Sequence, residues 1–155
     1  MNFNYYAIWR GVHVLSVLLW IGGVAFVTLV LIPALRKGGG DYETFEKLEH
    51  RFGNQAKITT QLALISGLAM LWVTDTWARL LNTWWLWAML LAWAMFTLML
   101  FVLEPIVIHK LLHQRAQKDP KGTLELLQRL HYLLLAVGLV ALVGGVIGAH
   151  GGMWF

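Results

Sequence analysis

Four long apolar stretches constrain this chain more than any other feature of its sequence. They cover about residues 8–35, 56–73, 84–112 and 130–155. A helix needs about 20 mostly apolar residues to cross the hydrocarbon of a bilayer. Hydrophobic residues make up 59% of the chain and charged residues 13%, which excludes a secreted or cytosolic globular protein and a nucleic-acid-binding module. We therefore expect an all-α integral membrane protein, an antiparallel, up-and-down four-helix bundle.

Short polar breaks separate the stretches, so residues 1–155 are expected to form a single transmembrane domain. Three glycines at 38–40 follow the first stretch, and a short loop at 75–82 follows the second. The polar segment 113–122 is expected to be the third loop. Residues 41–53 read as an amphipathic helix that leads into the second stretch. Cysteine is absent, which excludes disulfides and thiolate metal sites.

Cationic residues are biased toward one face of the expected bundle. The face with both termini and the second loop, here the terminal face, has only Arg10 and Arg79. The opposite face, here the basic face, has the other ten: Arg36, Lys37, Lys47, Arg51, Lys57, Lys110, Arg115, Lys118, Lys121 and Arg129. Positive residues stay on the cytoplasmic side. The sequence therefore predicts a multi-pass protein of a bacterial-type inner membrane with periplasmic N- and C-termini.

Several histidines lie in this apolar chain, where ionisable groups are costly and usually functional. His13 and His150 are expected at comparable depth on the terminal side of the first and fourth stretches, where both could bind one metal. His50, His109 and His131 belong to the basic face. Neutral imidazole binds haem iron, and helix bundles hold cofactors between facing helices. We expect one or two haem b groups, the first ligated by His13 and His150 and a second by two basic-face histidines. The alternative for each is a solvated interfacial side chain.

Small residues recur along one face of the fourth stretch, at Gly138, Ala141, Gly145, Gly148 and Gly152. Such a row is typical of close helix packing. It would equally suit a flat groove for a porphyrin, and the sequence does not separate these two interpretations.

A polar stripe enters the membrane with the second stretch and ends in Lys57 and Gln61. Glu104 lies at a similar depth on the third stretch, so the sequence predicts a Lys57–Glu104 ion pair that lines a polar cavity. Pro105 frees a backbone carbonyl one turn earlier and is expected to kink the helix. We expect Lys57, Gln61 and Glu104 to be the catalytic groups that move protons for a quinone or another lipophilic partner. A purely structural pairing is the alternative.

Two segments carry a resemblance to known families. HVLSVLLWIGGVAFVTLVLIPALR and FEKLEHRFGNQAKITTQLALISGLAMLW resemble the first half of the CopD-type copper-resistance membrane domain and of the J-type protoporphyrinogen oxidase, a small haem-associated membrane protein. By this resemblance His13 matches the first-span histidine and Arg51 the basic residue before the second span. The oxidase family begins its third span with a histidine and a nearby lysine, whereas this chain has WWLWAML there. The chain therefore looks like a divergent relative.

These observations favour a b-type haem protein that performs electron transfer or redox chemistry with a lipophilic partner, a membrane oxidoreductase if it turns over a substrate. Its expected partners are the bilayer and either a quinone or a redox protein. One alternative is CopD-like copper transport, although copper(I) favours Met and Cys and no methionine aligns with His13. The other alternative is a non-catalytic subunit or assembly factor of a membrane complex. A homodimer through the glycine row is also compatible with the sequence.

Overall fold

Helices account for nearly all of the described chain. The computed structural model describes residues 3–38 and 42–152, except for the side chains of residues 3 and 107–109. Within these residues there is no strand. The elements are α1 (Phe3–Phe26), the π-helix η1 (Val27–Leu31), α2 (Ile32–Gly38), α3 (Tyr42–Thr74), α4 (Arg79–Asn82), α5 (Trp84–Leu98), the π-helix η2 (Met99–Ile108), α6 (His109–Lys118) and α7 (Pro120–Ala149).

Four helical segments are long and apolar enough to cross a membrane: Asn4–Gly38, Tyr42–Thr74, Trp84–Ile106 and Pro120–Ala149. This confirms the expected number of spanning candidates. The bounds differ because the polar flanks are helical too. The amphipathic segment and the second stretch form one helix, α3, and the fourth segment begins at Pro120 rather than at residue 130.

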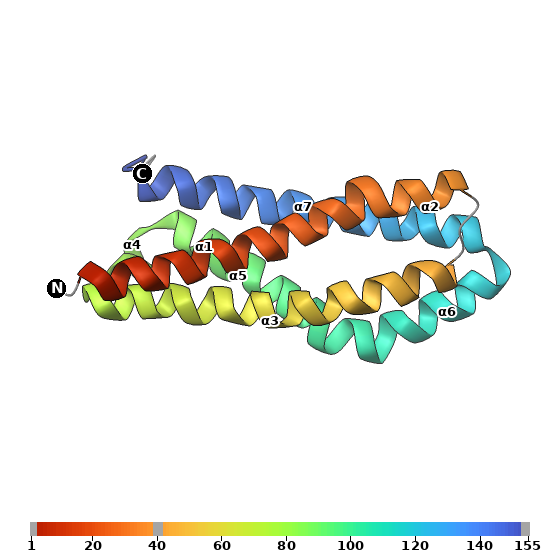
Figure 1. Ribbon diagram of the computed structural model, residues 1–155, viewed down its shortest axis with the longest axis horizontal. Coiled ribbons are helices and arrows are strands. Elements are labelled where there is room, and N and C mark those ends of the chain that lie inside the picture. The colour runs from red at the N-terminus through yellow and green to blue at the C-terminus, as the bar shows by residue number, and fades with distance from the viewer. Residues whose placement is uncertain (1–2, 39–41, 153–155) are drawn as a thin grey trace.

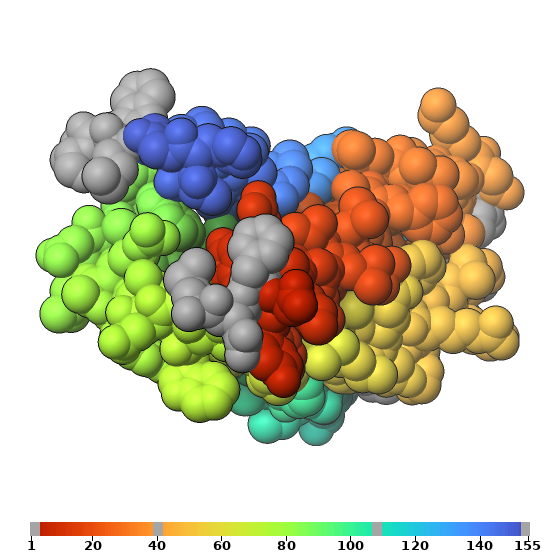
Figure 2. All heavy atoms as spheres, turned by 60° about the vertical axis from the view of Figure 1, so that its left-hand side comes forward, coloured from red at the N-terminus to blue at the C-terminus, as the bar shows by residue number. Residues whose placement is uncertain are grey.

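The two ends of the molecule differ in what they hold. The marked N and C ends lie together with α4 at one end, and α2, α6 and the start of α3 lie at the other (Figure 1). Figure 2 turns the first end toward the viewer, with the start of α1 (red) in the centre and the end of α7 (blue) above it. The cationic residues of the basic face gather at the other end, on α2, α3, α6 and α7.

The expected third loop is almost entirely helical. α6 continues to Lys118, and α7 begins at Pro120, so Asp119 alone separates them. The Asp119 side chain accepts a hydrogen bond from the Gly122 backbone N–H at 2.9 Å. Proline suits the first position of a helix, and aspartate suits the position before it. These two residues start a new helix without any loop, which is why the loop prediction was wrong here.

The third spanning segment changes its winding where its proline lies. η2 is a π-helix with Pro105 inside it. Proline cannot donate the usual backbone hydrogen bond, and a wider turn accommodates the freed carbonyl. The kink expected at Pro105 therefore takes the form of ten residues of π-helix that include Glu104.

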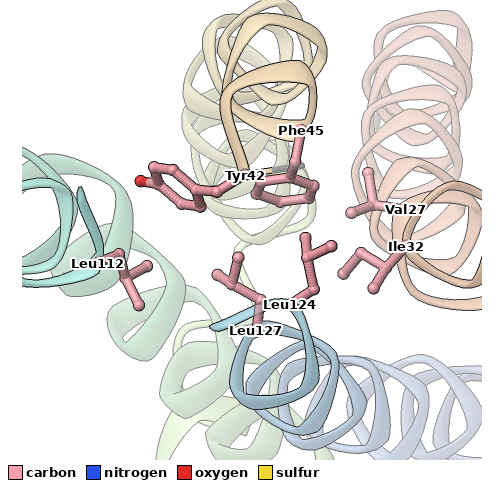
Figure 3. Close-up of a cluster of buried hydrophobic side chains, with 7 residues drawn as sticks. All are labelled: Val27, Ile32, Tyr42, Phe45, Leu112, Leu124 and Leu127. Carbon is pink, nitrogen blue, oxygen red and sulfur yellow. The ribbon is translucent and has the colours of Figure 1, made fainter. Parts of the chain in front are cut away.

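A buried hydrophobic cluster joins the first spanning segment, α3, α6 and α7 at the end of the molecule that holds the basic face, here called the basic end. Tyr42 and Phe45 from α3 meet side chains from the other helices, and Figure 3 shows the seven side chains converging: Val27, Ile32, Tyr42, Phe45, Leu112, Leu124 and Leu127. A second cluster lies further along, where the Trp20 and Phe96 rings meet edge to face at 4.9 Å. Between them the two clusters hold the helices around the site described next.

The small-residue row of α7 is filled by side chains of neighbouring helices. A Cβ added at Gly145 would overlap the Met89 side chain, and one at Gly148 would overlap the Trp85 ring. A Cβ at Gly138 would lie 2.7 Å from Ile21 of α1. The row therefore serves close helix packing, and side chains of α1 and α5 occupy the groove proposed for a porphyrin.

Candidate functional site

A cavity of about 120 Å³ lies between α1, α3, the α5–η2 segment and α7. Most of its wall is apolar or aromatic, with Trp20, Phe45, Phe52 and Phe96 among the lining residues. Its polar lining comes from Tyr42, Glu46, Glu49, Gln55, Glu104 and His131. Apolar walls with a few convergent polar groups are typical of ligand sites, so this is the candidate functional site.

Two carboxylates of the cavity lie beside Gly53 of α3. A side chain at Gly53 would begin 3.7 Å from Glu104 Oε1 and 3.9 Å from Glu49 Oε1. Glu49 lies one helical turn before Gly53 on α3, and Glu104 reaches over from η2. Both acids therefore lie beside the same turn of α3, next to the cavity.

The predicted ion pair between the second and third spans is present. Lys57 Nζ lies 3.6 Å from Glu104 Oε1, and the two side chains are 29% and 27% exposed. Glu49 also lies within the electrostatic reach of Lys57, but the ion pair of this ammonium is with Glu104. One turn further along α3, Gln61 Nε2 donates to Thr97 Oγ1 at 3.1 Å. The predicted catalytic set of Lys57, Gln61 and Glu104 thus lies along the contact between α3 and the α5–η2 segment.

His131 of α7 is the histidine that lines the cavity. Its ring meets Phe45 edge to face, with the centroids 6.0 Å apart. Its Nδ1 lies 2.9 Å from the Leu127 carbonyl oxygen and donates to it. The Nε2 atom is then the one left for a ligand, which is the arrangement seen in metal-binding and substrate-binding histidines.

His13 lies in the contact between α1 and α3. Its Nδ1 is 2.8 Å from the Ala63 carbonyl oxygen and 3.2 Å from Ser66 Oγ. Its Cε1 would touch a side chain at Gly67 at 3.4 Å, so the glycine makes room for the ring. The histidine that the sequence placed deep in the first span is therefore fixed by a neighbouring helix.

The other predicted histidines lie apart from the cavity lining. His150 ends α7, is exposed, and bonds the Val146 carbonyl of its own helix at 2.8 Å. His50 is exposed on α3. His109 begins α6, but its side chain lies outside the described part of the structure. The structure thus turns His13 toward α3 and places His150 at an exposed helix end, and it assigns the cavity to His131.

Four polar cavity residues are absent from the sequence-based predictions: Tyr42, Glu46, Glu49 and Gln55. The polar stripe predicted along α3 passes beside Glu46 and Glu49. A signal was available, because Glu49, Gly53 and Lys57 are spaced at four residues and share one face.

Comparison with known proteins adds no relative. No family model, curated protein or solved structure matches this chain. The resemblance to the CopD-type and J-type families therefore stays a prediction. Within the described residues, no three His, Asp or Glu side chains gather as metal ligands, so no multi-ligand copper site is drawn from this geometry.

Proposed function

We propose that this chain is an antiparallel four-helix protein of a bacterial-type inner membrane that binds a lipophilic redox molecule of the quinone kind in the cavity. The observation that carries the proposal is an apolar cavity whose wall holds one histidine and three carboxylates, two of them beside Gly53. Ionisable groups at membrane depth mark proton relays and substrate sites. Reduction of a quinone needs protons, so a site of this composition suits it.

The size of the cavity supports a ligand with a single ring. A cavity of about 150 Å³ lined by apolar side chains holds benzene, and the present cavity measures about 120 Å³. Larger ligands occupy about 300–1,000 Å³. The present cavity is smaller than the space that holds benzene, and a quinone ring carries oxygens and substituents besides, so binding requires the cavity to widen, with the tail passing between helices into lipid. A haem does not fit this cavity, so no haem is proposed on His131.

Each polar residue has a defined part in this proposal. The His131 Nε2 faces a ligand oxygen, while its Nδ1 stays on Leu127. Lys57 balances the charge of Glu104. Glu49 is then the carboxyl that exchanges a proton with the bound head group, because its neighbour already holds the ammonium.

Binding of a short-tailed quinone tests the proposal directly. Ubiquinone-1 is titrated into the protein in lipid nanodiscs and followed by calorimetry. Leu130→Trp fills the cavity, since Leu130 lines it, and should weaken binding at least about tenfold. The matched control is Leu133→Trp, at a side chain that is 60% exposed, and it should bind like the wild type. No binding by the wild type, or equal binding by Leu130→Trp, contradicts the proposal.

A second candidate, haem b binding at His13, is supported by a different observation. The Nδ1 of His13 is held by a carbonyl of another helix, which leaves Nε2 for iron as in ligating histidines. A bound haem would supply the electrons for quinone chemistry. Protein purified from haem-replete cells should have a Soret band that His13→Ala removes. A colourless preparation, or an unchanged spectrum in His13→Ala, excludes this candidate without affecting quinone binding.

A further inference from the structure

α6 continues the third spanning segment beyond its apolar part. The segment that could cross a membrane ends at Ile106, which is 67% exposed, and α6 follows it without a break in the helix. At about 1.5 Å per residue, Lys110 lies no more than about 6 Å beyond Ile106. The headgroup layer of a bilayer is about 5–8 Å thick on each side of the hydrocarbon. When this segment spans a membrane, the first turn of α6 therefore lies at the depth of the lipid headgroups.

One side of α6 packs on the bundle, and the other side is exposed. Leu112 is 7% exposed and belongs to the buried cluster at the basic end, and Ala116, one turn later, packs against that cluster. A helix turns by about 100° per residue, so Lys110, Leu111 and Lys118 lie on the side away from these two residues. All three are exposed, Leu111 by 57%. α6 is thus an amphipathic helix whose outer side combines cations with an apolar residue.

α6 and the first turn of α7 carry a surplus of positive charge. The segment 109–121 has one acid, Asp119, and four cations, namely Lys110, Arg115, Lys118 and Lys121. All four cations are exposed, and none forms an ion pair with a described residue. Elsewhere at the same end Arg36 pairs with Glu125, and Lys47 pairs with Glu43, each at 2.8 Å. The described chain thus leaves the cations of α6 available to a partner outside it.

A polar cleft beside α6 helps to define where an anion fits. It measures about 420 Å³ and is lined by Glu46 of α3 and by Lys110, His113 and Gln114 of α6. The Glu46 carboxylate disfavours a phosphate in the cleft, because like charges repel. α6 itself, HKLLHQRAQK, has no acidic residue. An anionic group is therefore expected on the outer side of α6 rather than in the cleft.

We propose that α6 and the first turn of α7 bind the headgroups of anionic phospholipids. Clusters of four or more Lys and Arg next to a spanning helix attract such lipids, and each cation near the surface strengthens binding about fivefold. Lys110 and Arg115 contribute most, because they are nearest to the span and the attraction falls off within a Debye length. Leu111 contacts the upper part of the acyl chains.

The position of the cluster favours a lipid over an acidic protein as the partner. Its first cation lies at headgroup depth, directly after a span whose last residue, Ile106, is exposed to lipid. None of the four cations lines the cavity of the quinone proposal, so the two sites are separate.

Lipid retention tests the proposal. The purified protein is equilibrated in detergent with equal amounts of phosphatidylglycerol, which is anionic, and phosphatidylcholine, which is zwitterionic. Native mass spectrometry then counts the lipids that stay bound. The wild type should retain phosphatidylglycerol in preference, and Lys110→Gln/Arg115→Gln should weaken its binding at least about tenfold. Equal retention of the two lipids by the wild type overturns the proposal.

Lys37→Gln/Arg51→Gln is the matched control, because it removes one lysine and one arginine from exposed positions of α2 and α3 at the same end. It should retain phosphatidylglycerol like the wild type, and an equal loss in this variant overturns the assignment to α6. Displacement of the lipid by soluble polyglutamate at equal charge points to an acidic protein partner and also overturns the proposal. Thermal unfolding in detergent checks that the variants are folded. Both should bind ubiquinone-1 like the wild type, so the lipid and quinone proposals can fail separately.

Discussion

At the scale of single residues, two helix ends use the left-handed conformation that closes a helix. Asp75 follows α3 with φ 51°, and Gly151 follows α7 with φ 84°. In the first case the Thr76 N–H donates to the Leu71 carbonyl at 3.0 Å, which is the bond of a Schellman motif. Glycine takes this conformation freely, whereas aspartate is strained there.

Replacement of Asp75 by glycine should therefore stabilise the protein by about 0.5–1 kcal/mol. The expected readout is a higher midpoint of thermal unfolding in detergent. Asp75→Ala should lower the midpoint, because alanine has neither glycine's freedom nor the local hydrogen bonding of aspartate. A midpoint that falls in the glycine variant would mean that the Asp75 side chain has another role.

At the scale of helices, α3 and the α5–η2 segment are joined inside the membrane by the Lys57–Glu104 pair. Removal of one partner leaves the other charge uncompensated, whereas removal of both does not. Because each side chain is about a quarter exposed, the cost lies between the values for surface and buried pairs.

Lys57→Met alone should thus destabilise the protein by about 1–3 kcal/mol. The double variant Lys57→Met/Glu104→Gln should recover most of that loss. Thermal unfolding of the four proteins of the double-mutant cycle measures the coupling. Additive effects of the two changes would show that the pair contributes nothing to the helix contact.

The small-residue row of α7 gives a second prediction at the scale of helices. Gly148→Ala should destabilise the protein by about 1–3 kcal/mol, because its Cβ would overlap the rigid Trp85 ring. Gly22 has nothing within 4 Å of its Cβ position. Gly22→Ala should therefore gain about 0.5–1 kcal/mol from helix propensity. Thermal unfolding compares the two, and equal behaviour of both variants would contradict close packing at Gly148.

At the scale of the whole molecule, charge is divided between its ends. The basic residues of α2, α6 and the start of α7 lie at the end away from the termini. The positive-inside rule predicts that this end faces the cytoplasm, and labelling tests that prediction. Since the chain has no cysteine, single introduced cysteines report sidedness without a background.

Lys118→Cys should resist a membrane-impermeant maleimide in spheroplasts and react after lysis. Asn82→Cys, on the terminal side, should react in intact spheroplasts. Labelling followed by gel-shift measures both. The reverse pattern would place the termini in the cytoplasm.

Much of the helical architecture could be predicted because apolar length alone selects spanning helices. The Lys57–Glu104 pair could be predicted too, because depth from the basic face is readable from residue counts. The positions of Glu49 and His131 at the cavity could not be predicted from the sequence. Periodicity says which residues share a face of one helix, but it does not say toward which neighbour that face is turned.

The sequence by itself determined three things: that the chain suits a lipid surrounding, that it has four apolar helices, and that its basic residues gather on one face. All three depend only on composition and length. Only the tertiary structure decided the rotation of each helix about its axis, because packing sets it: tryptophans against the glycines of α7, and Gly53 opposite Glu104. That rotation separates the surroundings of His13 from those of His150 and brings Glu49, Glu104 and His131 to one cavity. The candidate site is therefore a product of packing, built from residues that are far apart along the chain.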